Sequence, residues 1–496
     1  MAALLNKLTQ HIDRLQSNHR AVTNRPWLEL PSGRVYLLLV VLLSLAAAFI
    51  NFQVRNQQLT HWESHPEKFF VGDTPLFSTM DAGYFLGIAQ SLLRQETPND
   101  FMARRSFPDG EKNAQKNADS TPGKAPLLST LIFWLADNDS PQALLKTGNE
   151  VIPITAALTA LAIILCFGAT GYWLEGSVAA VGGGLSIAYL QRSSIGRIDT
   201  DQLNLGFFYL IIALIIWAGR AKKIWLALTL CGAMAAVTHI FHWWWPKPIL
   251  NWFYLLALVW LTYCFSRSLT RAALLGAVYL TLIGTLIFGP SIHINDFTSA
   301  ITSFGHMKLP NTLNTISELE ALSAGDFLNA LIGNIWLAGL SVVGVVGWAF
   351  LTPVYAVVFL PAISLAAMNI VFGNRVVFFA APIFWFGFAW LALTLGRYVL
   401  DRLMVPGAKT HKTGLASAQA CFAAIMFAMT YFVSFNPLSK PYVPDVAFSR
   451  EVVEGFRFLG DHVQQSDRDR TPVIATWWDY GYTASLFSQL PTLVDG

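Results

Sequence analysis

Long apolar stretches with very few charged residues recur along this chain of 496 residues, and they constrain its fold more than any other feature. The chain is 54% hydrophobic and only 13% charged, whereas a soluble domain carries about 25% charged residues. A helix of about 20 apolar residues can cross a bilayer. We therefore predict an all-α polytopic membrane protein with about eleven transmembrane helices. The predicted spans are 35–52, 151–168, 177–191, 204–219, 224–242, 250–266, 273–290, 328–350, 352–372, 377–396 and 415–434.

Lysine and arginine cluster in alternate loops between these spans, as in Arg220, Lys222 and Lys223 after the fourth span. Cytoplasmic loops of membrane proteins carry this excess of positive charge. We therefore place the N-terminus in the cytoplasm. The remaining loops then face the extracytoplasmic side: 53–150, 192–203, 243–249, 291–327, 373–376 and everything after 434.

Two domains are predicted from the change in composition along the chain. Residues 1–434 form the transmembrane domain, which includes a long first outer loop (53–150) and a second long outer loop (291–327). Residues 435–496 are more polar and contain two strand-like runs, 473–475 and 492–494. This pattern predicts the start of an α/β extracytoplasmic domain, and we expect that domain to be truncated at Gly496.

Three of the predicted outer loops carry acidic residues close to a membrane edge: Asp81, the pair Asp199 and Asp201, and Glu318. An isolated Asp-x-Asp in an outer loop is most often simply solvated. In an extended segment, however, Asp199 and Asp201 would point to the same face. Carboxylates brought together repel one another unless a cation lies between them. Hard oxygen ligands suit Mg²⁺ or Mn²⁺.

The segment after the last predicted span contains adjacent aromatic residues followed by an acid, Trp477-Trp478-Asp479-Tyr480-Gly481. Tryptophan rings give a large contact area at a low cost in conformational entropy. A carboxylate beside them can accept a hydrogen bond from a hydroxyl or an amide. The run therefore predicts a shaped binding slot for a short polar group.

Taken together, these motifs resemble those of the catalytic subunit of oligosaccharyltransferase, the membrane enzyme that glycosylates asparagine. The resemblance covers most of the chain. The motifs occur in the same order as in the family, and all lie on the same predicted side of the membrane. Its elements are Asp81 followed by Gly83-Tyr84, Asp199-Thr200-Asp201 downstream of Arg192, Thr315-Ile316-Ser317-Glu318, Arg375, and the Trp-Trp-Asp-Tyr-Gly run. The resemblance implies a membrane glycosyltransferase of the GT-C type in a multi-pass inner or cell membrane, with periplasmic catalytic loops. The Thr-Ile-x-Glu sequence is typical of single-subunit bacterial or archaeal enzymes.

The resemblance also implies an inverting reaction and a role for each motif. The donor is an oligosaccharide on a polyprenyl pyrophosphate, and the acceptor is the asparagine of an Asn-x-Ser/Thr sequon. The implied roles are catalysis by Asp81 and Glu318, binding of Mn²⁺ or Mg²⁺ by Asp81, Asp199 and Asp201, pyrophosphate binding by Arg375 and Arg192, and acceptor-peptide binding by Trp477, Trp478, Asp479 and Tyr482.

Two other functions are compatible with parts of this pattern. A different transferase that uses lipid-linked sugars, such as a mannosyl- or O-oligosaccharyl-transferase, would also need acidic residues in its first outer loop. A transporter would place ionisable groups near the middle of the membrane. Here the predicted spans are almost free of charge, which makes transport the least favoured function.

The acceptor sequon is predicted to be relaxed, because no lysine or arginine occurs between Glu318 and Arg375. In some bacterial members of the family, an arginine shortly after the Thr-Ile-x-Glu loop reads an acidic residue two positions before the acceptor asparagine. We expect peptides with and without aspartate at that position to be glycosylated at similar rates. A strong preference for the aspartate-containing peptide would contradict this prediction.

Overall fold

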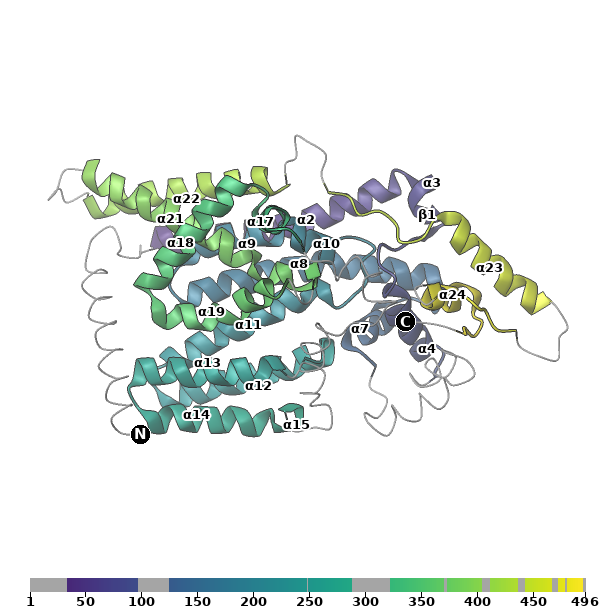
Figure 1. Cartoon of the computed structure of the whole chain (residues 1–496), viewed down its shortest axis with the longest axis horizontal. Coiled ribbons are helices and arrows are strands. Elements are labelled where there is room, and N and C mark those ends of the chain that lie inside the picture. The colour runs from purple at the N-terminus through teal and green to yellow at the C-terminus, as the bar shows by residue number, and fades with distance from the viewer. Residues whose placement is uncertain are drawn as a thin grey trace.

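The computed structural model describes residues 34–96, 125–247, 249–287, 322–369, 373–403, 411–435, 442–465, 472–477 and 480–493. Most of them are helical, and Figure 1 shows the longer helices running side by side in one bundle. In the described part of the chain, six helices are long and apolar enough to cross a membrane. They are α2 (Arg34–Glu63), α8 (Pro141–Ala169), α11 (Asp201–Arg220), α12 (Ile224–Trp244), α13 (Ile249–Ser266) and α21 (Ala381–Leu403). The multi-pass membrane character predicted from composition is thereby confirmed.

A seventh span is formed if the bent pair of helices α17 (Ala324–Ile332) and α18 (Ile335–Leu351), which meet at 81°, crosses as one unit. The other predicted spans correspond to shorter helices. These are α9 (Trp173–Gly184), α10 (Ile187–Ser193), α14 (Leu269–Leu282), α15 (Gly284–Ile287), α19 (Pro353–Ala367), and the apolar stretch Cys421–Val433 of α22 (His411–Phe435).

Several helix boundaries differ from the apolar stretches that predicted them. Helix α2 continues eleven residues past position 52, and α8 begins ten residues before position 151. Both helices extend beyond the apolar stretch because their polar ends pack against other parts of the protein. The predicted span 177–191 is two helices, since Ser186 caps α10 by accepting the Tyr189 N–H (3.3 Å).

The bundle has an inner layer and an outer layer. In α8 and α11, 72% and 78% of the apolar window is buried, whereas in α2 the share is 28%. The uncovered side of α2 carries large apolar side chains such as Leu37, Leu42 and Phe49. A solvent-facing helix would not tolerate this stripe, so it is the side that we assign to lipid.

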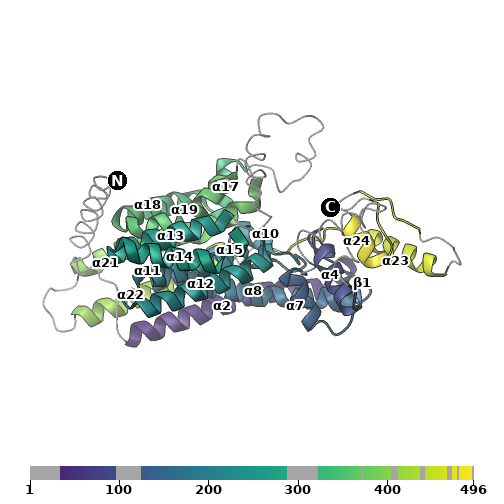
Figure 2. The same ribbon diagram turned by 90° about the horizontal axis from the view of Figure 1, so that it is seen from below.

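One end of the bundle carries a smaller region, to which α2 and α8 extend (Figures 1 and 2). Segments from the first outer loop and from the C-terminal part of the chain pack together here. They are α3 (Pro66–Phe69), the antiparallel pair β1 (Phe70–Val71) and β2 (Thr74–Pro75), α4 (Ala82–Leu93), α7 (Leu127–Leu135), α23 (Arg450–Gln465) and α24 (Gly481–Ser488). The two predicted C-terminal strands meet in one parallel bridge between Ile474 and Thr492.

Helices α18 and α21 cross at two glycines. A Cβ atom on Gly344 would overlap the backbone carbonyl of Gly387, and a Cβ atom on Gly387 would meet the Ser341 carbonyl. Gly339, on the same helix α18, has open space where its Cβ would lie. The two helices therefore approach closely at one point only because neither residue there has a side chain.

We expect Gly344→Ala to lower the midpoint of thermal unfolding in detergent, since overpacking costs about 1–3 kcal/mol. The matched control Gly339→Ala should leave the midpoint unchanged or raise it slightly, because alanine favours a helix over glycine by roughly 0.5–1 kcal/mol. Intrinsic tryptophan fluorescence measures both midpoints. Equal midpoints for the two variants would refute the close crossing.

Candidate active site

The candidate site is built around the loop between α10 and α11, residues 194–200, which is almost completely buried. Gly196 is the point of closest approach. Its φ is +80°, a conformation that L side chains rarely adopt, and a Cβ there would overlap the Trp62 ring and the Ser78 backbone nitrogen. The Gly196 N–H donates to Asn149 Oδ1 (2.7 Å), and its carbonyl accepts the Ser78 N–H (2.9 Å). Two segments separated by more than a hundred residues are thus joined by a backbone hydrogen bond.

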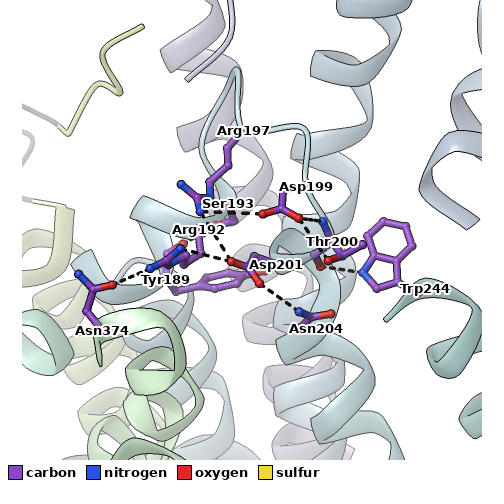
Figure 3. Close-up of polar contacts among 10 residues, drawn as sticks. All are labelled: Tyr189, Arg192, Ser193, Arg197, Asp199, Thr200, Asp201, Asn204, Trp244 and Asn374. Carbon is purple, nitrogen blue, oxygen red and sulfur yellow. Dashed lines mark hydrogen bonds and ion pairs between the residues drawn. The ribbon is translucent and has the colours of Figure 1, made fainter. Parts of the chain in front are cut away.

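Asp199, in this loop, and Asp201, directly after it, lie on one side and face arginines (Figure 3). Arg197 Nη2 lies 3.9 Å from Asp199 Oδ2 and 3.7 Å from Asp201 Oδ2, and Arg192 Nη1 lies 3.5 Å from Asp201 Oδ2. The segment is not extended, so that part of the sequence prediction is wrong. Asp199 sits in a bend and Asp201 is the first residue of α11. A carboxylate in the first turn of a helix interacts favourably with the helix dipole, which explains the position of Asp201.

Arg192 connects this loop to the segment that carries Arg375. Its Nη2 donates to Asn374 Oδ1 at 2.6 Å, and Asn374 and Arg375 lie in the first turn of the 3₁₀ segment η4 (Gly373–Ala380). The side chain of Arg192 is 5% exposed, whereas Arg375 is exposed. The two arginines expected to bind phosphate are therefore brought to the same region by an asparagine that the sequence analysis did not single out.

A cavity of about 230 Å³ opens beside Arg192 and Arg197, with Asn374 and Tyr442 in its wall. A second cavity of about 290 Å³ shares Gln191 and Asn374 with it. Burial raises the pKa of the Tyr442 hydroxyl, and the two arginines oppose that rise. Tyr442 is therefore a neutral hydroxyl at ordinary pH. The wall also contains Asp445, whose carboxylate pairs with Lys68 at 3.1 Å. The two guanidinium groups are the part of this wall that suits an anionic ligand.

Asp81 lies at the start of α4, three residues after Ser78. The next turn of α4 contacts the C-terminal segment, because a Cβ on Gly83 would overlap the backbone of Tyr482. The rings of Tyr84 and Tyr482 meet edge to face, with centroids 5.5 Å apart. The structure therefore brings the Asp81 segment against Tyr482, at the beginning of α24.

Two further residues of the site, Arg197 and Trp244, are not among those predicted from the sequence. Arg197 lies two positions before Asp199, and its charge next to an Asp-x-Asp motif could have indicated an internal counter-ion. Trp244, from the run 243–245, donates its indole N–H to the Thr200 carbonyl (2.7 Å). This hydrogen bond fixes the backbone between the two aspartates. No sequence pattern indicates it, because it depends on how α12 packs on α11.

Three of the predicted site residues, Glu318, Trp478 and Asp479, lie outside the described residues. Trp477 is described and is 62% exposed. A metal site needs several ligands around one point. Within the described residues, no group of three or more His, Cys, Asp or Glu side chains could hold a metal ion. The predicted set of Asp81, Asp199 and Asp201 therefore does not fit a metal in this arrangement, in which arginines face the two loop aspartates.

Comparison with known proteins identifies distant relatives, although no protein-family model matches the chain. Two undecaprenyl-diphosphooligosaccharide–protein glycotransferases of Campylobacter jejuni, from strains RM1221 and ATCC 700819 / NCTC 11168, are each 24% identical to it, over 416 and 417 residues respectively. Each alignment covers 74% of this chain and 55% of the relative. The chain thus spans about half the length of the curated relatives that it matches.

Solved structures share the fold at low sequence identity. The Archaeoglobus fulgidus oligosaccharyltransferase tethered to an acceptor peptide with the NVT sequon has a TM-score of 0.61 and is 13% identical, over 96% of this chain and 64% of that chain. The same organism's AglB, in complex with an inhibitory peptide and a dolichol-phosphate, has a TM-score of 0.58 at 13% identity, over 93% and 64%. A complex of the Archaeoglobus enzyme with Zn and sulfate has a TM-score of 0.55 at 14% identity, over 91% and 62%.

Substitution of Gly196 tests how closely the loop is held. Gly196→Ala and the control Gly72→Ala both place a side chain at positive φ, which costs about 1–2 kcal/mol. Only Gly196 has neighbours that a Cβ would overlap, since Gly72 has open space. We expect Gly196→Ala to lower the thermal unfolding midpoint in detergent further than Gly72→Ala, by a difference of about 1–3 kcal/mol. An equal loss of stability would show that the loop is not closely packed.

Proposed function

We propose that this chain belongs to the oligosaccharyltransferase family and transfers an oligosaccharide from a polyprenyl-pyrophosphate carrier to the asparagine of Asn-x-Ser/Thr sequons in proteins. The observation that carries the proposal is the convergence of three separate segments on the end of α10 and the loop that follows it. Ser78 reaches it from the Asp81 segment, Asn374 from the Arg375 segment, and Tyr442 from the C-terminal segment. These segments carry the residues to which the sequence analysis assigned chemistry.

The reaction must overcome the low reactivity of an amide nitrogen. Its lone pair is delocalised into the carbonyl group, and in peptides this resonance underlies a rotational barrier of about 18–20 kcal/mol. Carboxylates that accept hydrogen bonds from the NH₂ group can hold the amide where that delocalisation is weakened. Asp81 and Glu318 are the proposed acceptors, and attack on the anomeric carbon from the face opposite the pyrophosphate inverts its configuration.

The departing pyrophosphate is negatively charged and needs positive partners. Arg192 and Arg375 are proposed to supply them, since a guanidinium presents its donors in a planar fork that matches phosphate oxygens. The cavity bordered by Arg192 and Arg197 supports this role. Mn²⁺ or Mg²⁺ is the proposed cofactor, with Asp81, Asp199 and Asp201 as ligands. That set does not form a metal site in the arrangement described above, so no step of this mechanism depends on the metal.

The acceptor peptide is proposed to lie against the C-terminal segment. Trp477, Trp478 and Asp479 would bind the Ser or Thr hydroxyl, and a site built to hydrogen-bond a hydroxyl rejects peptides that lack it. Tyr482 would line the same groove. Its contact with α4 supports this assignment, because it places the groove next to the helix that follows Asp81.

The proposed topology has about eleven spans, which adds the shorter helices α9, α14, α19 and α22 to the longer ones. The N-terminus lies in the cytoplasm. The catalytic loops and the C-terminal segment lie on the extracytoplasmic side of the inner or cell membrane. Residues 1–434 then form the transmembrane domain, and residues 435–496 belong to an α/β extracytoplasmic domain. The parallel bridge between Ile474 and Thr492, with α24 between its strands, supports this last assignment.

Replacement of Asp81 tests the proposed chemistry. We expect Asp81→Asn to lower transfer from a polyprenyl-diphosphate oligosaccharide to a labelled Asn-x-Thr peptide on the order of 100-fold or more, as for the loss of one hydrogen-bonding group that stabilises a transition state. Asp73→Asn is the matched control, since Asp73 is an exposed residue of the turn between β1 and β2. Undiminished transfer by Asp81→Asn would contradict the role of Asp81. Transfer to serine or threonine peptides in place of asparagine peptides would instead indicate an O-oligosaccharyl-transferase.

A further inference from the structure

Arg55, in the outer half of α2, is a completely buried cation that the mechanism above does not use. A buried charge is costly unless other groups compensate it. Arg55 is compensated by four hydrogen bonds to neutral groups. Its Nη2 donates to the Gly184 carbonyl (2.9 Å) and to Ser193 Oγ (2.6 Å), its Nε donates to the Ser193 carbonyl (3.2 Å), and its Nη1 donates to Asn51 Oδ1 (3.3 Å).

The two carbonyls that Arg55 binds share a special position, since Gly184 is the last residue of α9 and Ser193 is the last residue of α10. The last carbonyls of a helix have no partner within the helix. They also carry the negative end of the helix dipole. One guanidinium therefore satisfies the C-terminal ends of two helices at once, and its charge is balanced by their dipoles. The ring of Tyr189, 5.5 Å from the guanidinium carbon, adds a cation–π contact.

Helix α2 continues to hold the chain beyond Ser193. One turn after Arg55, Gln58 donates from Nε2 to Ser194 Oγ (3.2 Å) and accepts the Ile195 N–H at Oε1 (3.3 Å). The bound residues 193–195 directly follow Arg192 and directly precede Gly196. The polar face of α2 thus fixes the chain immediately on the C-terminal side of Arg192 and immediately before the turn that leads to Asp199.

We infer that Arg55 is a positioning residue for donor binding. By joining the ends of α9 and α10, it sets the place of Arg192 and of the loop that carries Arg197 and Asp199. The expected effect on donor binding rests on the proposed function. The placement of Arg192 and the loop by Arg55 does not, and it can be tested without measuring activity. Loss of the guanidinium hydrogen bonds of Arg55 frees the loop and weakens the pairing of Arg192 with the donor phosphate. The acceptor segment near Tyr482 keeps its place on α4.

The chain contains a matched control in Arg397. It is equally buried, and it pairs with Glu175 at 2.8 Å, in the first turn of the same helix α9 whose last carbonyl binds Arg55. Gly184 lies nine positions after Glu175 along the helix, which is roughly 14 Å. Arg55→Lys and Arg397→Lys therefore make the same chemical change in two side chains that contact opposite ends of α9. Lysine keeps the charge in both, but it cannot span two acceptors with a planar fork.

The first measurement is hydrogen–deuterium exchange of the full chain in detergent. Deuterium uptake is read from the fragment that covers residues 193–200. We expect Arg55→Lys to speed exchange there at least about tenfold, the factor for losing one charge-assisted hydrogen bond, and Arg397→Lys to leave it within about twofold. Equal effects of the two variants, or no effect of Arg55→Lys, would overturn the inference. If Arg55→Lys does not fold, Ser193→Ala removes the hydroxyl that accepts from Arg55 and donates to the Tyr189 carbonyl (2.8 Å) but keeps the Ser193 carbonyl contact, and a smaller but local rise in exchange is expected.

The second measurement separates this inference from the proposed function. In transfer assays with wild-type protein and Arg55→Lys, we expect KM for the polyprenyl-diphosphate donor to rise at least about tenfold, while the affinity for a fluorescent Asn-x-Thr peptide stays unchanged. If the affinities for donor and peptide fall together, in proportion to a fall in the thermal unfolding midpoint, the role of Arg55 is merely structural and positioning is refuted. Absence of transfer by the wild-type chain would count against the proposed function alone, because the exchange experiment still decides the position of the loop.

Discussion

The backbone hydrogen bond from the Ser78 N–H to the Gly196 carbonyl is the contact on which the candidate site depends. Asp81 follows three residues after the donor, and Asp199 follows three residues after the acceptor. The contact forms only because Gly196 lacks a side chain and can adopt positive φ against the ring of Trp62. The Phe77 carbonyl, one residue earlier, accepts the Ala447 N–H (2.8 Å), so the C-terminal segment is tied to the same point.

The handling of buried charge gives the bundle its internal order. Arg397 and Glu175 neutralise each other at the beginning of α9, while Arg55 is balanced at its end by helix carbonyls. Both solutions satisfy the requirement that polar groups in an apolar interior find partners. They differ in consequence. The first joins two helices within the bundle, and the second joins a helix of the bundle to the chain that carries the candidate site.

Sequence analysis predicted the membrane bundle well because the free energy of transferring a helix to lipid is roughly a sum over its side chains. That sum can be read from neighbouring residues in the sequence. It was less accurate at helix ends. The polar extension of α2 to Glu63 is stabilised by packing against the small end region, which hydropathy does not register. The Asp-x-Asp motif was recognised, but its conformation was wrongly predicted as extended, since the helical start at Asp201 depends on the rest of α11.

The sequence by itself determined an all-α membrane protein, the order of its apolar segments, and the loops in which acidic, basic and aromatic residues gather. These properties follow from local composition and short motifs. Only the tertiary structure decided which of these residues meet: Arg192 with Asn374, the loop aspartates with Arg197, and Gly83 with Tyr482. Such pairs are separated by up to about 400 positions along the chain and are fixed by close packing between helices, where a single Cβ atom decides whether two backbones can touch.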